Sequence, residues 1–163
     1  MGLVSPRVSA SLVDIVALAA WLGAALFFSA AVTPGLFAVL PTRALAGAVV
    51  GRLLPVVFYT GMAVGALVMA VEVSAHKSWS WRGREALAAV MIVACGVGQL
   101  VIAPRIERVR AEIGVPMDAL PVADPRRVEF GRLHGLSVAW LGLAMLAAVV
   151  ALVLSVRGRA TRP

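Results

Sequence analysis

Four long uncharged stretches dominate the pattern of apolar and polar positions along this chain. Each reaches roughly the 20 residues that a helix needs to cross about 30 Å of hydrocarbon. None alternates as a barrel strand would, and lipid offers no hydrogen-bond partners to an open backbone. The pattern therefore predicts four transmembrane helices, from the runs Ile15 to Thr42, Leu53 to Val71, Ala86 to Pro104 and Gly135 to Val156.

The chain is expected to form a single all-α membrane domain over residues 1–163. Its predicted fold is a four-transmembrane-helix bundle with helices extended beyond the bilayer on one side. Ser11 with Asp14 has the form of a capping box, and Asp124 before Pro125 has the form of an N-cap and first helical position. Including the extensions, the spans are predicted at approximately residues 11–39, 43–75, 84–113 and 125–156.

The extensions of the third and fourth helices are charged and lie on the same side of the membrane. The fourth helix would be about 48 Å long at about 1.5 Å per residue, so its first turns stand outside the hydrocarbon. The two charged sets are placed to pair with each other, which favours a solvated hairpin over an anion-binding arginine cluster. They comprise Arg105, Glu107, Arg108, Arg110 and Glu112 on one helix and Asp124, Arg126, Arg127, Glu129 and Arg132 on the other.

Composition supports a membrane protein, because 61% of residues are hydrophobic and only 14% are charged. The 15 Lys and Arg side chains against 8 Asp and Glu give a net charge of +7, which favours contacts with anionic lipid headgroups rather than nucleic acid. The segments on the two sides of the membrane carry nearly equal numbers of lysine and arginine residues, so this count alone does not decide the orientation. We interpret the chain as a bacterial-type inner membrane protein with both termini in the cytoplasm.

Three small-xxx-small frames indicate close helix packing: GAVVG at 47–51, GMAVG at 61–65 and GRLHG at 131–135. Such frames let helix backbones approach where lipid supplies no hydrophobic drive. The second and fourth helices are therefore predicted to pack tightly. The same frames favour a homo-oligomer, because four spans alone enclose little room.

Ionisable side chains are missing from the middle of every span, whereas proton pumps normally carry them there. This disfavours a proton-driven pump. Asp14 is interpreted as a helix-capping carboxylate rather than as a buried functional acid.

His134 lies between the charged extension and the hydrocarbon, and Ser137 follows it on the predicted face of the same helix. The structural interpretation is a hydrogen bond between helices, to Tyr59 or Gln99. The functional alternative makes His134 a metal or cofactor ligand. Haem held by two histidines of one chain fails, because His76 lies on the opposite side of the membrane, about 30 Å away.

Sulfur side chains offer a second candidate for metal binding. Met62 and Met69 are seven residues apart on the second helix, and Met91 and Cys95 are four apart on the third. Soft ligands of this kind suit Cu(I). Ordinary core packing explains the same positions.

Motifs in all four helices carry a resemblance to a known family. They are WLGAALFFSAAVTPGLF (21–37), AGAVVGRLLPVVFYTG (46–61), Pro104 with Arg108, and FGRLHGLS (130–137). Over nearly its whole length the chain resembles the transmembrane protein 205-like family, also described as domain of unknown function 4149. The resemblance implies a four-span helical protein, and a eukaryotic relative is associated with resistance to platinum drugs by export. In that pattern an asparagine often follows the histidine by two turns, where this chain has Leu141, so part of a polar site is absent.

The leading hypothesis is a non-enzymatic protein that transports or handles a small solute or soft metal. Its predicted polar site consists of Tyr59, Arg108, His134 and Ser137 at one membrane face, with His134 as the candidate metal ligand. One alternative is a haem- or copper-binding redox subunit or enzyme. Another is an assembly subunit of a membrane complex. No catalytic residue is assigned, and the cofactor and the substrate stay open.

Overall fold

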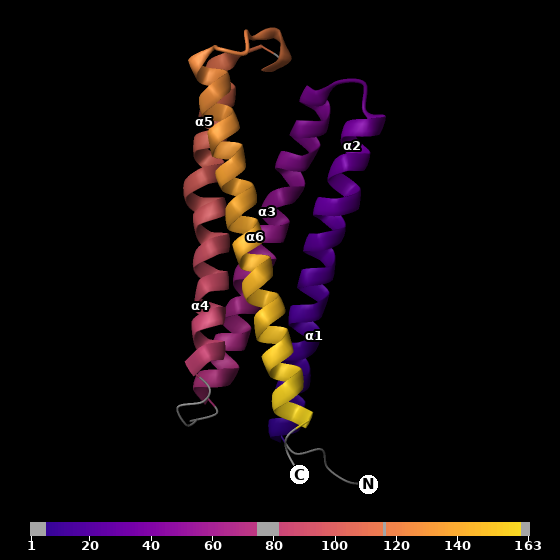
Figure 1. The fold of residues 1–163 in the computed structure, drawn as a ribbon, viewed down its shortest axis with the longest axis vertical. Helices are drawn as coiled ribbons and strands as arrows, with labels where there is room; N and C mark the ends of the chain where they lie inside the picture. The colour runs from indigo at the N-terminus through magenta and orange to yellow at the C-terminus, as the bar shows by residue number, and fades with distance from the viewer. Residues whose placement is uncertain (1–5, 75–81, 116, 161–163) are drawn as a thin grey trace.

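The structure is a computed structural model that describes residues 6–74, 82–115 and 117–160. Every regular element in these residues is helical (Figure 1). The α-helices are α1 (Pro6–Phe27), α2 (Thr33–Val39), α3 (Arg43–Ser74), α4 (Arg82–Gly96), α5 (Ala103–Ile113) and α6 (Pro125–Ala160). The shorter elements are the π-helices η1 (Phe28–Val32) and η3 (Val97–Ile102) and the 3₁₀ turn η4 (Met117–Ala119).

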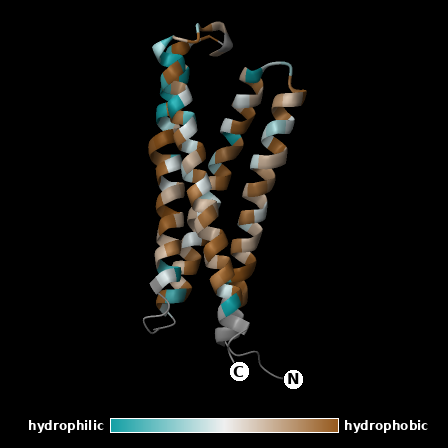
Figure 2. Cartoon of the chain, in the orientation of Figure 1, coloured by the Kyte–Doolittle hydropathy of each residue, from teal (hydrophilic) through white to brown (hydrophobic). Residues whose placement is uncertain are grey.

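These elements form four long rods, because η1 joins α1 to α2 and η3 joins α4 to α5 without a break. Each rod is long and apolar enough to cross a membrane, and Figure 2 shows hydrophobic residues along the middle of each. The apolar spans are Leu12–Val39, Arg43–Ser74, Gly83–Ile113 and Pro125–Arg157. The prediction of a four-helix membrane bundle is confirmed.

The two π-helical segments have a common cause in the sequence. Pro34 follows η1 directly after Thr33, and Pro104 follows η3 directly after Ala103. A proline inside a helix lacks the N–H for one hydrogen bond, and its ring clashes with the carbonyl four residues earlier. A wider turn ahead of the ring relieves that clash and lets each rod continue across the bilayer.

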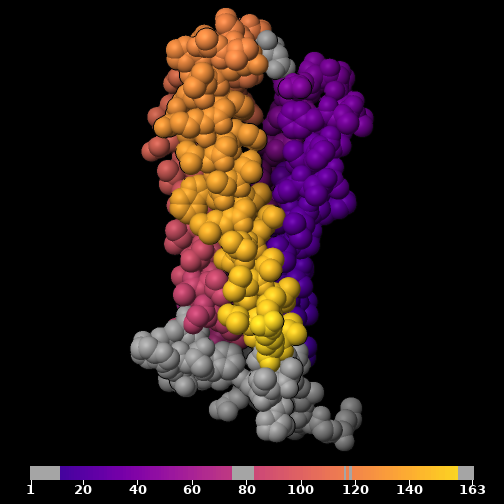
Figure 3. Space-filling view, in the orientation of Figure 1, coloured from indigo at the N-terminus to yellow at the C-terminus, as the bar shows by residue number. Residues whose placement is uncertain are grey.

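The four rods pack closely at one end of the bundle and diverge at the other. α1 and α4 each contact both α3 and α6. Toward the loops after α2 and α5, α2 pairs with α3 and α5 pairs with α6, and the two pairs spread apart (Figure 1). Figure 3 shows the resulting notch at the surface. The α5–α6 hairpin also reaches beyond the α2–α3 turn, as the charged extensions predict.

Small residues let the rods come together in the core. Four alanines of α6 are buried against the neighbouring helices, alongside larger side chains such as Phe58 and Met91. Trp21 of α1 packs in the same cluster, and its indole N–H donates to the carbonyl of Val57 on α3 at 2.9 Å. The alanines are Ala144, Ala147, Ala148 and Ala151.

Glycines at close contacts between helices confirm one predicted small-xxx-small frame, and a second frame lacks the predicted contacts. A β-carbon at Gly61 would lie 2.6 Å from Sγ of Cys95, and one at Gly65 would lie 2.8 Å from Cγ1 of Ile92. Gly98 in η3 makes room for the ring of Phe58 in the same way, a contact that no frame predicts. The frame at 131–135 faces open space within this chain, so its predicted role in packing the fourth helix is wrong.

One predicted helix start is confirmed, at Asp124. The carboxyl of Asp124 accepts a hydrogen bond from the backbone N–H of Arg126 at 2.9 Å, and α6 begins at Pro125. Hydrogen bonds from the Arg126 side chain and backbone lower the pKa of Asp124. The stabilisation by this cap is therefore present above the ordinary aspartate pKa of about 3.9 and is lost as the pH falls through the lowered value.

The other predicted helix start is wrong. Ser11 and Asp14 do not cap the first helix, because α1 already begins at Pro6. Asp14 is instead 1% exposed inside the bundle.

Close packing at Gly61 predicts a strong effect of a single methyl group. Gly61→Ala should lower the free energy of unfolding by about 1–3 kcal/mol, because Cys95 and the hydrogen-bonded Trp21 must both move. Gly142→Ala is the matched control, since nothing lies within 4 Å of its β-carbon position. Thermal unfolding in detergent, followed by circular dichroism, measures both. Equal effects of the two substitutions would contradict this packing.

Candidate functional site

The four residues of the predicted polar site differ in exposure. Tyr59 on α3, Arg108 on α5 and His134 on α6 are exposed, while Ser137 is buried. His134 and Ser137 therefore do not present their side chains to the same surroundings, although they lie one turn apart. Among the described residues no hydrogen bond or ion pair joins any two of the four, and the site stays a prediction.

His134 makes a ring contact rather than the expected hydrogen bond. It stacks with Phe130, one turn earlier on α6, with ring centroids 6.2 Å apart and planes inclined by 3°. Within the described part of the chain it forms no hydrogen bond with Tyr59 or Gln99. No group of three His, Cys, Asp or Glu side chains within those residues is placed to hold a metal ion.

Arg110 connects three helices at the notch. Its guanidinium lies 5.6 Å from the ring centroid of Phe130 on α6 and 3.0 Å from Glu107 on its own helix. It also lies over α3, 3.3 Å from the β-carbon position of Gly51 and 3.5 Å from that of Gly47. The frame at 47–51 therefore accommodates an arginine side chain instead of a helix backbone.

The charged sets on α5 and α6 pair within their own helices. Glu107 with Arg110 and Glu129 with Arg132 are pairs three residues apart, and Asp124 pairs with Arg126 at 2.9 Å. Among the described residues no ion pair links α5 to α6. Three arginines, Arg110, Arg126 and Arg132, instead pair with a carboxylate one turn away or less along their own segment. Between the two sets, Arg126 is attracted to Glu112 without forming an ion pair, so the predicted direct pairing is not seen among the described residues.

A second polar group lies at the opposite end of the bundle, buried among three helices. We call it the buried triad: Asp14 of α1, Glu72 of α3 and Arg84 of α4. Nη1 of Arg84 lies 2.8 Å from Oε1 of Glu72, and Nη2 donates to Oδ2 of Asp14 at 3.2 Å. The three residues are 1%, 4% and 5% exposed, respectively.

The charges of the buried triad are unequal. It contains two carboxyl groups and one guanidinium, and Oδ1 of Asp14 has no hydrogen-bond partner among the described residues. Charged groups are costly to bury unless paired, and intramembrane ionisable groups usually mark ion pathways or proton relays. The buried triad is therefore the strongest candidate functional site in this structure.

The sequence contains a signal for this site that the capping interpretation missed. Asp14 stands immediately before the first uncharged run, Glu72 immediately after the second, and Arg84 two residues before the third. All three positions fall on the side of the membrane that holds the chain termini. Charged residues at the ends of three apolar runs, on one side, allow an interhelical ion network, although Glu85 and Arg82 beside Arg84 leave the choice of partners open.

The sulfur side chains lie in or against the core. Met91 and Cys95 are fully buried, and Met62 and Met69 pack against the same cluster. Cys95 fills the space that Gly61 leaves open. These contacts account for all four residues as packing groups.

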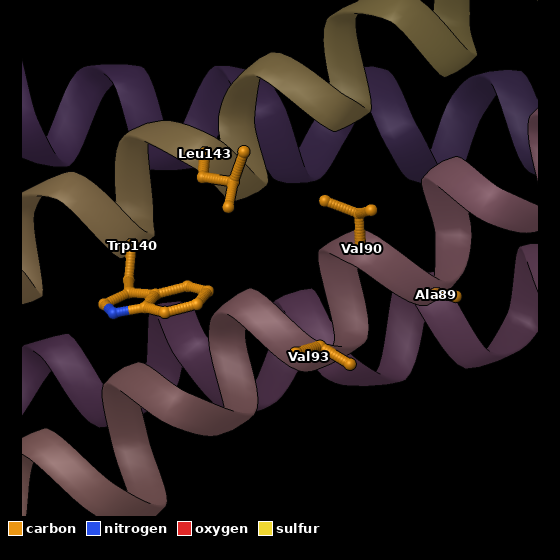
Figure 4. A pocket seen from close by; sticks show the side chains of 5 residues that line it. All are labelled: Ala89, Val90, Val93, Trp140 and Leu143. Atoms are coloured by element: carbon orange, nitrogen blue, oxygen red, sulfur yellow. The ribbon is translucent and has the colours of Figure 1, made fainter.

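A shallow apolar groove on the outer surface lies between α4 and α6 (Figure 4). Its volume is about 280 Å³, and its lining contains no polar side chain other than the indole of Trp140. Such a surface suits a lipid acyl chain rather than a polar substrate. It is lined by Ala89, Val90, Val93, Trp140 and Leu143.

Comparison with known proteins gives one match. The family described as Domain of unknown function (DUF4149) matches residues 16–114, more than half of the chain. No curated protein and no solved structure matches the chain. The matched region includes Glu72 and Arg84 and begins two residues after Asp14.

Removal of the arginine from the buried triad should strongly destabilise the bundle. Arg84→Gln leaves two buried carboxyl groups facing each other, and breaking such a buried pair costs about 3–5 kcal/mol. Arg110→Gln is the control, because its pair with Glu107 is partly exposed and pairs of that kind contribute about 0–1 kcal/mol. Chemical unfolding in mixed micelles compares the two. A similar loss in both variants would show that the buried triad contributes no more than a surface pair.

Proposed function

The chain belongs to the family described as Domain of unknown function (DUF4149), and we propose that it transports or handles a small solute within the membrane through the buried triad. The observation that carries this proposal is an ion network of three residues, each at most 5% exposed, in an otherwise apolar multi-pass bundle. A protein in which well-packed apolar side chains replace such a buried ion network is often equally stable or more stable. A network that stability alone does not require supports a functional role.

The excess carboxyl group indicates the class of solute. A site with two carboxyl groups and one guanidinium attracts cations and repels anions. We therefore propose a small cationic solute. Carboxylate oxygens are hard ligands, so organic cations fit this site better than the soft metal ions that sulfur ligands favour.

We further propose that the chain is a transmembrane protein 205-like member of its family. Three of the four motif segments that carry this resemblance lie within the matched residues 16–114, and FGRLHGLS lies outside them. The predicted polar site with His134 belongs to this proposal, and so does the association of that family with export. Leu141, in place of the expected asparagine, is buried in the core cluster.

A role in assembly is the second candidate. Gly131, Gly135 and Gly142 on α6 have nothing within 4 Å of their β-carbon positions, although α6 packs tightly elsewhere. This face supports a homo-oligomer or a partner helix. No contact among the described residues favours the haem or copper alternative, since His134 is exposed on α6 and Cys95 is enclosed in the core.

For the placement in the cell we propose an inner membrane with both termini in the cytoplasm and anionic headgroups at both faces. The supporting feature is the density of arginine and lysine between Lys77 and Arg84 and in the tail. The buried triad would then face the cytoplasm, and the notch would face the opposite compartment.

Transport should depend on Asp14. In liposomes that contain the purified protein, we expect uptake of Ag⁺, a soft cation similar to Cu(I), or of ethidium, an organic cation, above that of empty liposomes. Asp14→Asn should abolish the increase, because it fixes the side chain in a neutral form, while Glu107→Gln at the other face should retain it. Uptake by Asp14→Asn equal to the wild type, or no uptake of either probe by the wild type, would refute the proposal.

Topology can be tested with alkaline phosphatase, which requires disulfides and is active only outside the reducing cytoplasm. A fusion after the last residue should be inactive, and a fusion after Pro121, in the loop before α6, should be active. The reverse pattern of activity would place the termini outside.

A further inference from the structure

The charge of the buried triad does not balance when all three groups are ionised. Arg84 offers one positive charge to the carboxyl groups of Asp14 and Glu72, which leaves one negative charge among residues that are at most 5% exposed. An uncompensated carboxylate in such surroundings costs far more than a neutral carboxylic acid. The geometry points to one proton held on Asp14, at Oδ1, which the buried triad exchanges with water on the side of the termini.

Distances within the buried triad identify which carboxyl group holds the proton. Glu72 has the shorter contact with Arg84, 2.8 Å against 3.2 Å for Asp14, so Glu72 keeps the negative charge. Oδ2 of Asp14 accepts from Nη2 of Arg84, as the carbonyl oxygen of a neutral acid would. Oδ1 accepts from no donor among the described residues, although it is buried. Oδ1 is therefore the oxygen of Asp14 to which we assign the proton.

Other polar groups near this end leave that assignment unchanged. On α4, Glu85 is acidic and half-buried, which adds negative charge rather than compensating for it. On α6, the hydroxyl of Ser155 donates to the carbonyl of Ala151 at 2.7 Å, and Arg157 is exposed with an interaction of its own. On α3, the hydroxyl of Ser74 donates to the carbonyl of Val71 at 3.0 Å.

A sodium ion explains the same imbalance less well. Hard cations take about six oxygen ligands, whereas among the described residues Oδ1 of Asp14 is the one fully buried carboxyl oxygen that lacks a hydrogen-bond partner. A proton needs no such shell. Asp14 is the ninth residue of α1, about two turns inside the helix end at which the chain begins.

Proton exchange gives the bundle two charge states. With the proton bound, Arg84 and Glu72 form a neutral pair and Asp14 is a neutral hydrogen-bond acceptor. When the proton leaves for water, Asp14 becomes a carboxylate and competes with Glu72 for the same guanidinium, which changes the attraction between α1 and the α3–α4 pair. This inference is linked to the proposed function at one point: a transported cation that binds Asp14 would displace the proton.

The test is infrared spectroscopy of the full chain in lipid nanodiscs, with a titration from mildly acidic to mildly alkaline pH. We expect the wild type to show the carbonyl band of a protonated carboxyl group at mildly acidic pH, shifted in deuterated water and lost as the pH rises. Asp14→Asn should remove the band. Glu72→Gln should also remove it, because Arg84 then has a single carboxylate partner and Asp14 ionises. Glu107→Gln is the control and should keep the band.

Three results would overturn the inference: no such band in the wild type, a band that persists in Asp14→Asn, or a band that appears only when sodium is removed. The wild-type titration does not depend on the folding of any variant. It is also independent of transport, so a band in a protein that moves neither Ag⁺ nor ethidium would retain the proton site and reject the proposed function. Transport without the band would support the proposed function and reject the proton site.

Discussion

The contact of Arg84 with two carboxyl groups is the interaction on which this end of the bundle depends. Helices in a membrane gain no hydrophobic drive from each other, so packing and polar contacts must hold them together. The buried triad joins α1, α3 and α4 through residues far apart in the sequence. At the opposite end no comparable network exists among the described residues, and there the two helix pairs spread apart (Figure 1). One closed end and one divergent end follow from this asymmetry.

Close approach of the helices also stabilises the bundle. Gly61, Gly65 and Gly98 each accept a bulky neighbour where a methyl group would not fit. These contacts lie between the buried triad and the notch, so they fix α3 against α4 in the middle of the membrane. The charged groups can then respond to protonation at one end without loosening the centre of the bundle.

The sequence predicted most of the fold and little of the site. Uncharged runs of about 20 residues identify spans, because the bilayer imposes both their length and their helical form. Asp124 before Pro125 was recognised as a cap, since capping depends on local sequence alone. The pair Gly61 and Gly65 was recognised by its spacing. These features share one property, which is that neighbouring residues determine them.

The failures concern contacts between helices. Asp14 has the spacing of a capping box with Ser11, yet its partner Arg84 lies on another helix, and no local pattern reveals it. His134 and Ser137 are one turn apart, but the packing of α6 buries one and exposes the other. Helical spacing determines which residues share a face, whereas only the tertiary arrangement determines which part of that face meets a neighbour.

The most direct measurement for this account compares the free energies of unfolding of Asp14→Asn and Glu72→Gln in the same lipid mixture. If Asp14 already carries a proton, asparagine replaces a neutral side chain of similar shape and should cost little. Glu72→Gln removes the charge that balances Arg84 and should cost clearly more at acidic pH, where Asp14 cannot take its place. Equal losses, or a larger loss for Asp14→Asn, would mean that Asp14 is ionised and would contradict the central claim.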